Sequence, residues 1–169
     1  MPEKIFSSPA GEIRLIVNNG FILYCNWEDP ECGKKLEKVR RIIASHEIIK
    51  DSEEDSRILE EAEFQLLEYF AGRLTVFNLP IKLYGSLFQK KIWDKISEIP
   101  YGETISYGDL GIESCGSASF SRALAQACSA NPVAIIVPCH RVTGSHGKLG
   151  GYTGGLSRKR FLLELENSF

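Results

Sequence analysis

A cysteine, a histidine and an arginine follow one another at positions 139–141, directly after a proline and the apolar run at residues 133–137. A thiol with a pKa of about 8.5 is mostly protonated at neutral pH, so a nucleophilic cysteine needs a base or a positive field nearby. His140 and Arg141 are candidates for both. Side chains adjacent in sequence need not face each other, however, and the motif also fits a core cysteine followed by two surface cations. It therefore makes Cys139 a candidate nucleophile and leaves plain packing open.

The segment that follows this motif is rich in glycine. Glycine lets the backbone approach a ligand closely or adopt a positive φ. The segment lacks the Gly-Lys-Ser/Thr sequence that opens the helix of a phosphate-binding loop. We therefore expect a flexible wall beside a flat ligand, with Tyr152 as its ring. The glycines are Gly144, Gly147, Gly150, Gly151, Gly154 and Gly155.

A cysteine hydrolase is another chemistry open to such a thiol. It would need a histidine from elsewhere in the chain and an Asn or Asp to orient it, and neither His46 nor His146 has a recognisable setting. Cys25, Cys32 and His46 lack the spacing of a zinc site, so we expect no metal and no cofactor. The five cysteines contain no Cys-x-x-Cys pair, and a disulfide framework is not expected.

The composition is that of an ordinary globular protein, with 43% hydrophobic and 25% charged residues. No run of about eighteen apolar residues is present, and the first residues lack the apolar segment of a signal peptide. Together with reduced cysteines, these features predict a cytoplasmic protein, or a nuclear one in a eukaryote, that does not associate with a membrane.

The two halves of the chain differ in charge. Residues 1–80 carry 10 Lys and Arg against 15 Asp and Glu, whereas residues 81–169 carry 10 against 7. The overall net charge of −2 argues against a bulk nucleic-acid binder. The basic excess of the second half, which contains the cysteine motif, permits an anionic partner there.

The first half predicts a small α/β unit that serves as a scaffold. Residues 4–27 alternate like short strands, and Asn18-Asn19-Gly20 is a strong hairpin signal because its central positions tolerate positive φ. Apolar periodicity predicts helices over 31–46 and 52–72, and residues 47–50 fit a further strand.

The second half predicts mostly helices after a linker at residues 75–85. An amphipathic helix is expected to begin near Ser86, and a last helix to end the chain. The apolar run before the cysteine motif is predicted to be a strand. A short helix from Ser106, a glycine turn and a longer helix over 118–130 have the spacing of a helix-turn-helix.

Two stretches resemble a known family. Residues 88–110 read FQKKIWDKISEIPYGETISYGDL, and residues 131–166 read NPVAIIVPCHRVTGSHGKLGGYTGGLSRKRFLLELE. They resemble the O6-alkylguanine-DNA alkyltransferases, also called methylated-DNA–protein-cysteine methyltransferases, which repair DNA by direct reversal. The resemblance covers roughly residues 84–166. It implies an α+β protein with a ribonuclease-H-like domain at 1–80 and a helical DNA-binding domain with the reactive cysteine at 81–169.

The resemblance also implies a mechanism with one turnover per molecule. Cys139 would accept a methyl or alkyl group from O6 of guanine, and from O4 of thymine, and keep it as a thioether. His140 would take the thiol proton through a water, and Glu166 would orient the imidazole. Tyr107 would donate a proton toward guanine N3. From the residues alone, Glu166 also fits a surface carboxylate and Tyr107 a core aromatic.

Double-stranded DNA with an O6-alkylguanine is the implied partner, bound by a monomer that flips the damaged nucleotide. Arg122 matches the family's arginine finger, which fills the gap in the duplex, although it also fits a solvated helix arginine. Ala123 and Ala127 would allow the recognition helix to approach DNA closely. Asn131 would brace the link from this helix to the active site, and it also fits a plain Asn-Pro turn.

The flipped guanine would be read by backbone groups of Cys139, Val142 and Thr153, with Tyr152 as a wall of the pocket. The stretch at residues 111–121 departs from the family pattern, since it lacks an Asn-Pro or Lys-Pro turn before the recognition helix. The alternative function is a non-catalytic helix-turn-helix protein that binds or senses alkylated DNA.

Overall fold

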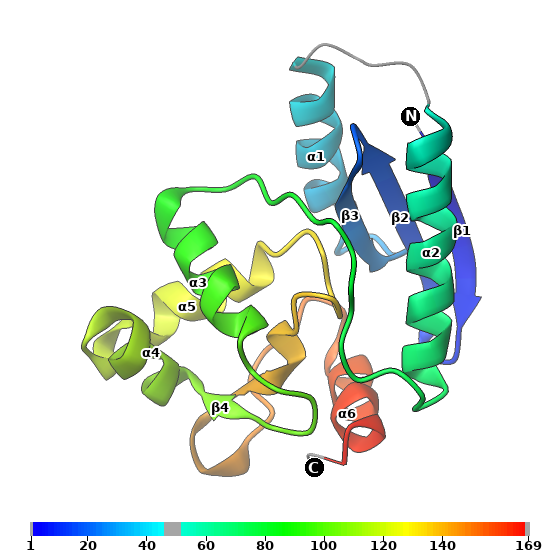
Figure 1. Ribbon diagram of the computed structural model, residues 1–169. Helices are drawn as coiled ribbons and strands as arrows, with labels where there is room; N and C mark the ends of the chain where they lie inside the picture. The colour runs from blue at the N-terminus through cyan, green and yellow to red at the C-terminus, as the bar shows by residue number, and fades with distance from the viewer. Residues whose placement is uncertain (1, 46–51, 168–169) are drawn as a thin grey trace. The chain divides into compact units, whose positions relative to one another are not determined.

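The computed structural model describes residues 2–45 and 52–167 and divides the chain into two compact units, Met1–Tyr84 and Gly85–Phe169 (Figure 1). The division comes later than the expected boundary at residue 80. The reason is that Ile22 N–H donates to the Pro80 carbonyl at 2.8 Å and Lys82 N–H donates to the Ile22 carbonyl at 3.1 Å. His46 and the strand expected at 47–50 lie outside the described residues.

The first unit contains a three-stranded antiparallel sheet in the order β1-β2-β3. The expected hairpin between β2 and β3 is confirmed, with φ of 53° at Asn19 and 76° at Gly20. Ile16 lies opposite Tyr24 in the register of this pair. The strands are β1 (Glu3–Ser8), β2 (Gly11–Asn18) and β3 (Phe21–Trp27).

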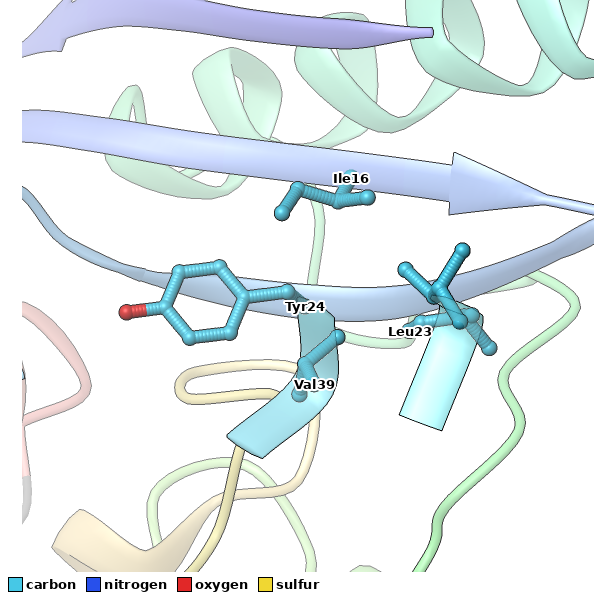
Figure 2. Packing of buried hydrophobic residues seen from close by; sticks show 5 residues of the cluster. Ile16, Leu23, Tyr24 and Val39 are labelled. Atoms are coloured by element: carbon cyan, nitrogen blue, oxygen red, sulfur yellow. The ribbon is translucent and has the colours of Figure 1, made fainter. Parts of the chain in front are cut away.

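Two helices, α1 (Gly33–Ser45) and α2 (Glu53–Phe70), pack on this sheet. Figure 2 shows Val39 of α1 close to Ile16, Leu23 and Tyr24 of the strands, in a cluster that also includes Ile43. The Ser52 hydroxyl caps α2 by accepting from Asp55 N–H, at the start expected for this helix. The Asp55 carboxylate in turn accepts from Gly20 N–H at 2.7 Å, which ties the helix to the hairpin.

The second unit is mostly helical (Figure 1). Ser86 and Gln89 form a capping box at the start of α3, and Ser106 caps α4. The Trp93 indole N–H donates to the Ala127 carbonyl at 2.9 Å, so α3 is fastened to α5. The helices are α3 (Leu87–Ser97), α4 (Tyr107–Cys115), the 3₁₀ turn η1 (Ala118–Phe120), α5 (Ser121–Ser129) and α6 (Leu156–Leu165).

The close approach of α4 to η1 depends on a glycine. A Cβ built on Gly111 would lie 2.7 Å from the Ser117 carbonyl oxygen and 3.4 Å from Ala118 Cα. Real Cβ atoms do not come this close to backbone, so any larger residue would push the two segments apart.

The strand predicted at residues 133–137 is wrong. The segment is buried but folds into a tight turn, with φ of 72° at Ile135 and Val137 N–H donating to the Val133 carbonyl at 3.1 Å. An apolar run indicates burial and does not by itself distinguish a strand from a compact turn. The sheet of this unit instead pairs β4 (Ile105–Ser106) in parallel with β5 (Val142–Thr143).

Candidate active site

Cys139 begins a 3₁₀ turn, η2 (Cys139–Arg141), and is only 4% exposed. The side-chain amide of Asn131 donates to Cys139 Sγ at 3.1 Å and to the Val137 carbonyl at 3.0 Å. Its carbonyl oxygen accepts from Val133 N–H at 2.9 Å. Asn131 therefore spans the buried turn and fixes the position of the thiol at its end.

His140 and Glu166 form a hydrogen bond of 2.7 Å between Nε2 and Oε1, and both residues are buried. Burial lowers the pKa of His140, an effect that outweighs the Glu166 hydrogen bond, which raises it. The imidazole is therefore neutral at neutral pH. With the Glu166 carboxylate accepting at Nε2, the proton resides on Nε2, and Nδ1 is the basic nitrogen.

Glu166 lies at the C-terminal cap of α6 and also pairs with Arg141. Arg141 Nε donates to Oε2 at 2.9 Å and a terminal nitrogen donates to Oε1 at 3.0 Å, a two-pronged contact. The other terminal nitrogen donates to the Ile99 carbonyl at 2.6 Å. The interpretation of His140 and Arg141 as surface cations is thus wrong, because both are buried around one carboxylate.

Tyr107 is the first residue of α4 and is half-buried. Burial, followed by the neighbouring Cys128 and Cys139, raises its pKa, so the phenol keeps its proton at neutral pH. The Lys159 ammonium lies 5.9 Å from the centre of the Tyr107 ring. Glu166 is buried, so its interpretation as a surface carboxylate does not hold.

Lys159 is a residue that the sequence did not single out. It is fully buried in α6, and its Nζ donates to the Val142 carbonyl at 2.6 Å and to the Gly151 carbonyl at 3.2 Å. Desolvation lowers its pKa to about 8. The neighbouring thiols of Cys128 and Cys139 have the opposite, smaller effect of raising this pKa. In sequence it belongs to the basic run at 158–160 and looks solvated. The only sequence signal of its inward position is that Leu162, an apolar residue, follows three positions later and so lies on the same face of the helix.

Cys128 was also not singled out. It lies in α5 and is 8% exposed, and the neighbouring Cys139, followed by burial, raises its pKa. Nothing in the sequence separates it from the other cysteines, since the approach of α5 to the turn at Cys139 is a property of the packing.

The residues expected to contact DNA or the base are more scattered. Arg122 is exposed in the first turn of α5, and Ala123 is half-buried behind it. Ala127 is only 2% exposed, and its carbonyl accepts from Trp93, while the close approach of Ala123 and Ala127 to DNA stays a prediction.

The three expected pocket residues all lie on segments tied to the thiol's surroundings. Val142 is buried in β5, and its carbonyl is the one that Lys159 contacts. The Thr153 hydroxyl donates to the Ser129 carbonyl at the end of α5 at 3.2 Å. Tyr152 is half-buried in the glycine-rich loop.

The comparisons with known proteins point to one family. The family described as 6-O-methylguanine DNA methyltransferase, DNA binding domain, matches residues 87–168. A methylated-DNA–protein-cysteine methyltransferase of Methanosarcina acetivorans is 42% identical over 97% of both chains, and one of Mycobacterium bovis is 53% identical over 62% of both. The crystal structure of Mycobacterium tuberculosis OGT in complex with DNA is 36% identical, with a TM-score of 0.77, and covers 98% of this chain and 92% of that one.

The α+β fold holds a buried cysteine that is followed by a buried histidine paired with Glu166. The chain belongs to the methylated-DNA–protein-cysteine methyltransferase family.

Proposed function

We propose that this protein repairs alkylated DNA by direct reversal, moving a methyl or larger alkyl group from O6 of guanine, and from O4 of thymine, to Cys139. The observation that carries the proposal is the bond between the buried His140 and Glu166 next to the thiol held by Asn131. Relatives named methylated-DNA–protein-cysteine methyltransferase, and the DNA complex of a similar structure, support it.

The chemistry follows from the protonation states. Nδ1 of the neutral His140 takes the Cys139 proton through a water, and Glu166 and Arg141 hold the ring in place. The sulfur then attacks the alkyl carbon, a C–S bond forms, and the bond between carbon and O6 breaks. The guanine leaves as an anion, the protonated Tyr107 hydroxyl donates toward its N3, and the proton that His140 took from the thiol restores the neutral base. No residue of the site can hydrolyse a thioether, so each molecule reacts once.

A base stacked in duplex DNA is out of reach of a thiol this buried, so the damaged nucleotide must be flipped out, at a cost of a few kcal/mol. In this proposal α4 and α5 form a helix-turn-helix, and the exposed Arg122 fills the gap that the base leaves. Backbone groups of Cys139, Val142 and Thr153 read the guanine, and Tyr152 forms a wall.

The first unit is proposed to be a ribonuclease-H-like scaffold domain, and the protein to act as a cytoplasmic monomer without metal or cofactor. Within residues 2–45 and 52–167, no helix is long and apolar enough to cross a membrane. A protein that only binds alkylated DNA has no use for a His-Glu pair behind the thiol, so the non-catalytic alternative is not favoured.

The test is the mass of the intact protein after incubation with a short duplex that contains one O6-methylguanine. We expect a gain of one methyl group, mapped to Cys139 by peptide analysis. Cys139→Ser should gain nothing, and Cys115→Ser, which alters a thiol outside the site, should behave like the wild type. An unchanged wild-type mass despite tight binding to the duplex would contradict methyl transfer.

A further inference from the structure

Lys159 is a buried cation that the proposed transfer chemistry does not use. Its ammonium is fully buried in α6 and donates to two backbone carbonyls, of Val142 at 2.6 Å and of Gly151 at 3.2 Å. Both acceptors are neutral, and a buried charge is costly unless its hydrogen bonds replace the lost solvation. An apolar side chain of similar size would fill the same space without that cost, so the ammonium indicates a role beyond packing.

The two carbonyls belong to the segments that border the proposed base pocket. Val142 lies in β5, whose backbone is proposed to read the guanine, and Gly151 directly precedes Tyr152 and Thr153 of the opposite wall. Hydrogen bonds from an ionised donor are stronger than those between neutral groups. One side chain, Lys159, therefore joins both sides of the pocket.

The glycine-rich loop also approaches the ring of Tyr107. A Cβ built on Gly150, whose φ is 68°, would lie 3.1 Å from Tyr107 Cε2. The Lys159 ammonium lies 5.9 Å from the centre of the same ring. A chain this rich in glycine has little conformational preference of its own, so these contacts decide where the loop lies.

We propose that Lys159 is a positioning residue for alkyl transfer, and that its ammonium fastens the glycine-rich loop to β5 and keeps the base pocket formed before DNA binds. The inference rests on the proposed function, which assigns this pocket to the flipped guanine. A loop that is already ordered costs less to fix when its ligand enters. Lys159 therefore favours capture of the base and does not act on the reacting atoms.

The first measurement is hydrogen exchange of the full-length protein without DNA, read by mass on peptides from residues 144–155. Lys159→Met keeps the length of the side chain but lacks the ammonium, and its loop should exchange faster than that of the wild type. Lys159→Gln, which keeps a neutral donor, should show a smaller change in the same direction. Arg160→Met, which removes an exposed cation from the same helix, should exchange like the wild type.

Urea unfolding of each variant separates a local change in the loop from a loss of global stability. Equal exchange of the loop in the wild type and in both Lys159 variants would overturn the proposal.

The second measurement is single-turnover methyl transfer from a duplex with one O6-methylguanine, over a range of protein concentrations. Lys159→Met should need about tenfold more protein to reach its half-maximal rate, because charge-assisted hydrogen bonds that order the pocket are lost. Its maximal rate should stay close to that of the wild type. Binding to an undamaged duplex, which does not fill the pocket, should not change.

The outcomes separate this inference from the proposed function. A loss confined to the maximal rate would assign Lys159 to the chemistry at Cys139 and overturn its role in capturing the base. A wild type that transfers no methyl group would contradict the proposed function, whereas the loop exchange is read without DNA and tests the fastening by itself.

Discussion

At the scale of single residues, one carboxylate organises the site. Glu166 accepts hydrogen bonds from His140 and from two nitrogens of Arg141, all in a buried setting. A buried charge that loses its partner is strongly destabilising, because the remaining charge is neither solvated nor paired. Glu166 therefore affects both the orientation of the proposed base and the stability of the fold.

Replacing Glu166 by glutamine should expose both effects. We expect methyl transfer to slow by roughly 100-fold, since His140 loses the charge that orients and stabilises it, and the free energy of unfolding to fall by about 3 kcal/mol. Single-turnover kinetics and urea unfolding measure the two. Glu164→Gln, on the exposed side of the same helix, should change neither, and a fully active Glu166→Gln would rule out the role of this carboxylate.

His140 should make stability depend on pH. Its pKa is lowered in the folded protein, so the unfolded chain binds more protons between the folded pKa and the unfolded value of about 6.5. This contribution is fully present above about pH 6.5 and is lost as the pH falls. Urea unfolding from pH 8 to pH 5 should show a steeper acid loss for the wild type than for His140→Gln. The exposed His146→Gln should follow the wild type, and parallel curves for all three would contradict the assignment.

At the scale of elements, close backbone contacts set how the helices present these residues. The Lys159 side chain ties α6 to β5 and to the glycine-rich loop, while Asn131 ties the end of α5 to the thiol. The Gly111 contact holds α4 against η1, directly before α5 begins with Arg122 nearby. The geometry of the proposed DNA-binding helices therefore depends on a residue that carries no functional group.

Gly111→Ala is expected to destabilise the protein, although alanine is normally the better helix former by about 1 kcal/mol. The added methyl group would meet the Ser117 carbonyl at 2.7 Å, and relieving that clash should cost about 1–3 kcal/mol. Thermal unfolding measures the loss. Gly33→Ala, where a Cβ meets nothing within 4 Å, should be neutral or slightly stabilising. Equal stability of the two variants would show that α4 and η1 can move apart freely.

At the scale of the whole molecule, the proposed function combines binding a duplex with extracting one nucleotide from it. Arg122 is exposed on α5 while the thiol is buried, and in the proposed function the arginine acts on the DNA and not on the reacting atoms. A variant of Arg122 can therefore test nucleotide flipping separately from the chemical step of alkyl transfer.

Arg122→Ala should slow methyl transfer from a duplex by about tenfold or more, because the flipped state loses the side chain that fills the gap. The reaction with an O6-alkylguanine supplied as a free base should keep its rate, since no flipping is needed. Arg57→Ala, exposed on α2 of the first unit, is the matched control and should leave both rates unchanged. A loss on both substrates would place Arg122 in the chemical step.

The sequence by itself determined which residues could act as nucleophile and base, and much of the local structure. The helix starts expected at Ser52, near Ser86 and at Ser106 and the Asn19-Gly20 turn depend on neighbouring residues only, so they were predictable and are confirmed. The resemblance to a family supplied the roles of the site residues, which the spacing of residue types did not.

Only the tertiary structure decided which groups meet. Apolar residues at 133–137 indicate burial, but whether they extend or turn depends on the elements packed around them, and here they turn at Ile135. Arg141, Lys159 and Cys128 look like surface or packing residues in sequence. Their inward positions depend on how α5 and α6 pack around η2. For Arg141 and Lys159, hydrogen bonds formed within the core offset the cost of burying a polar group.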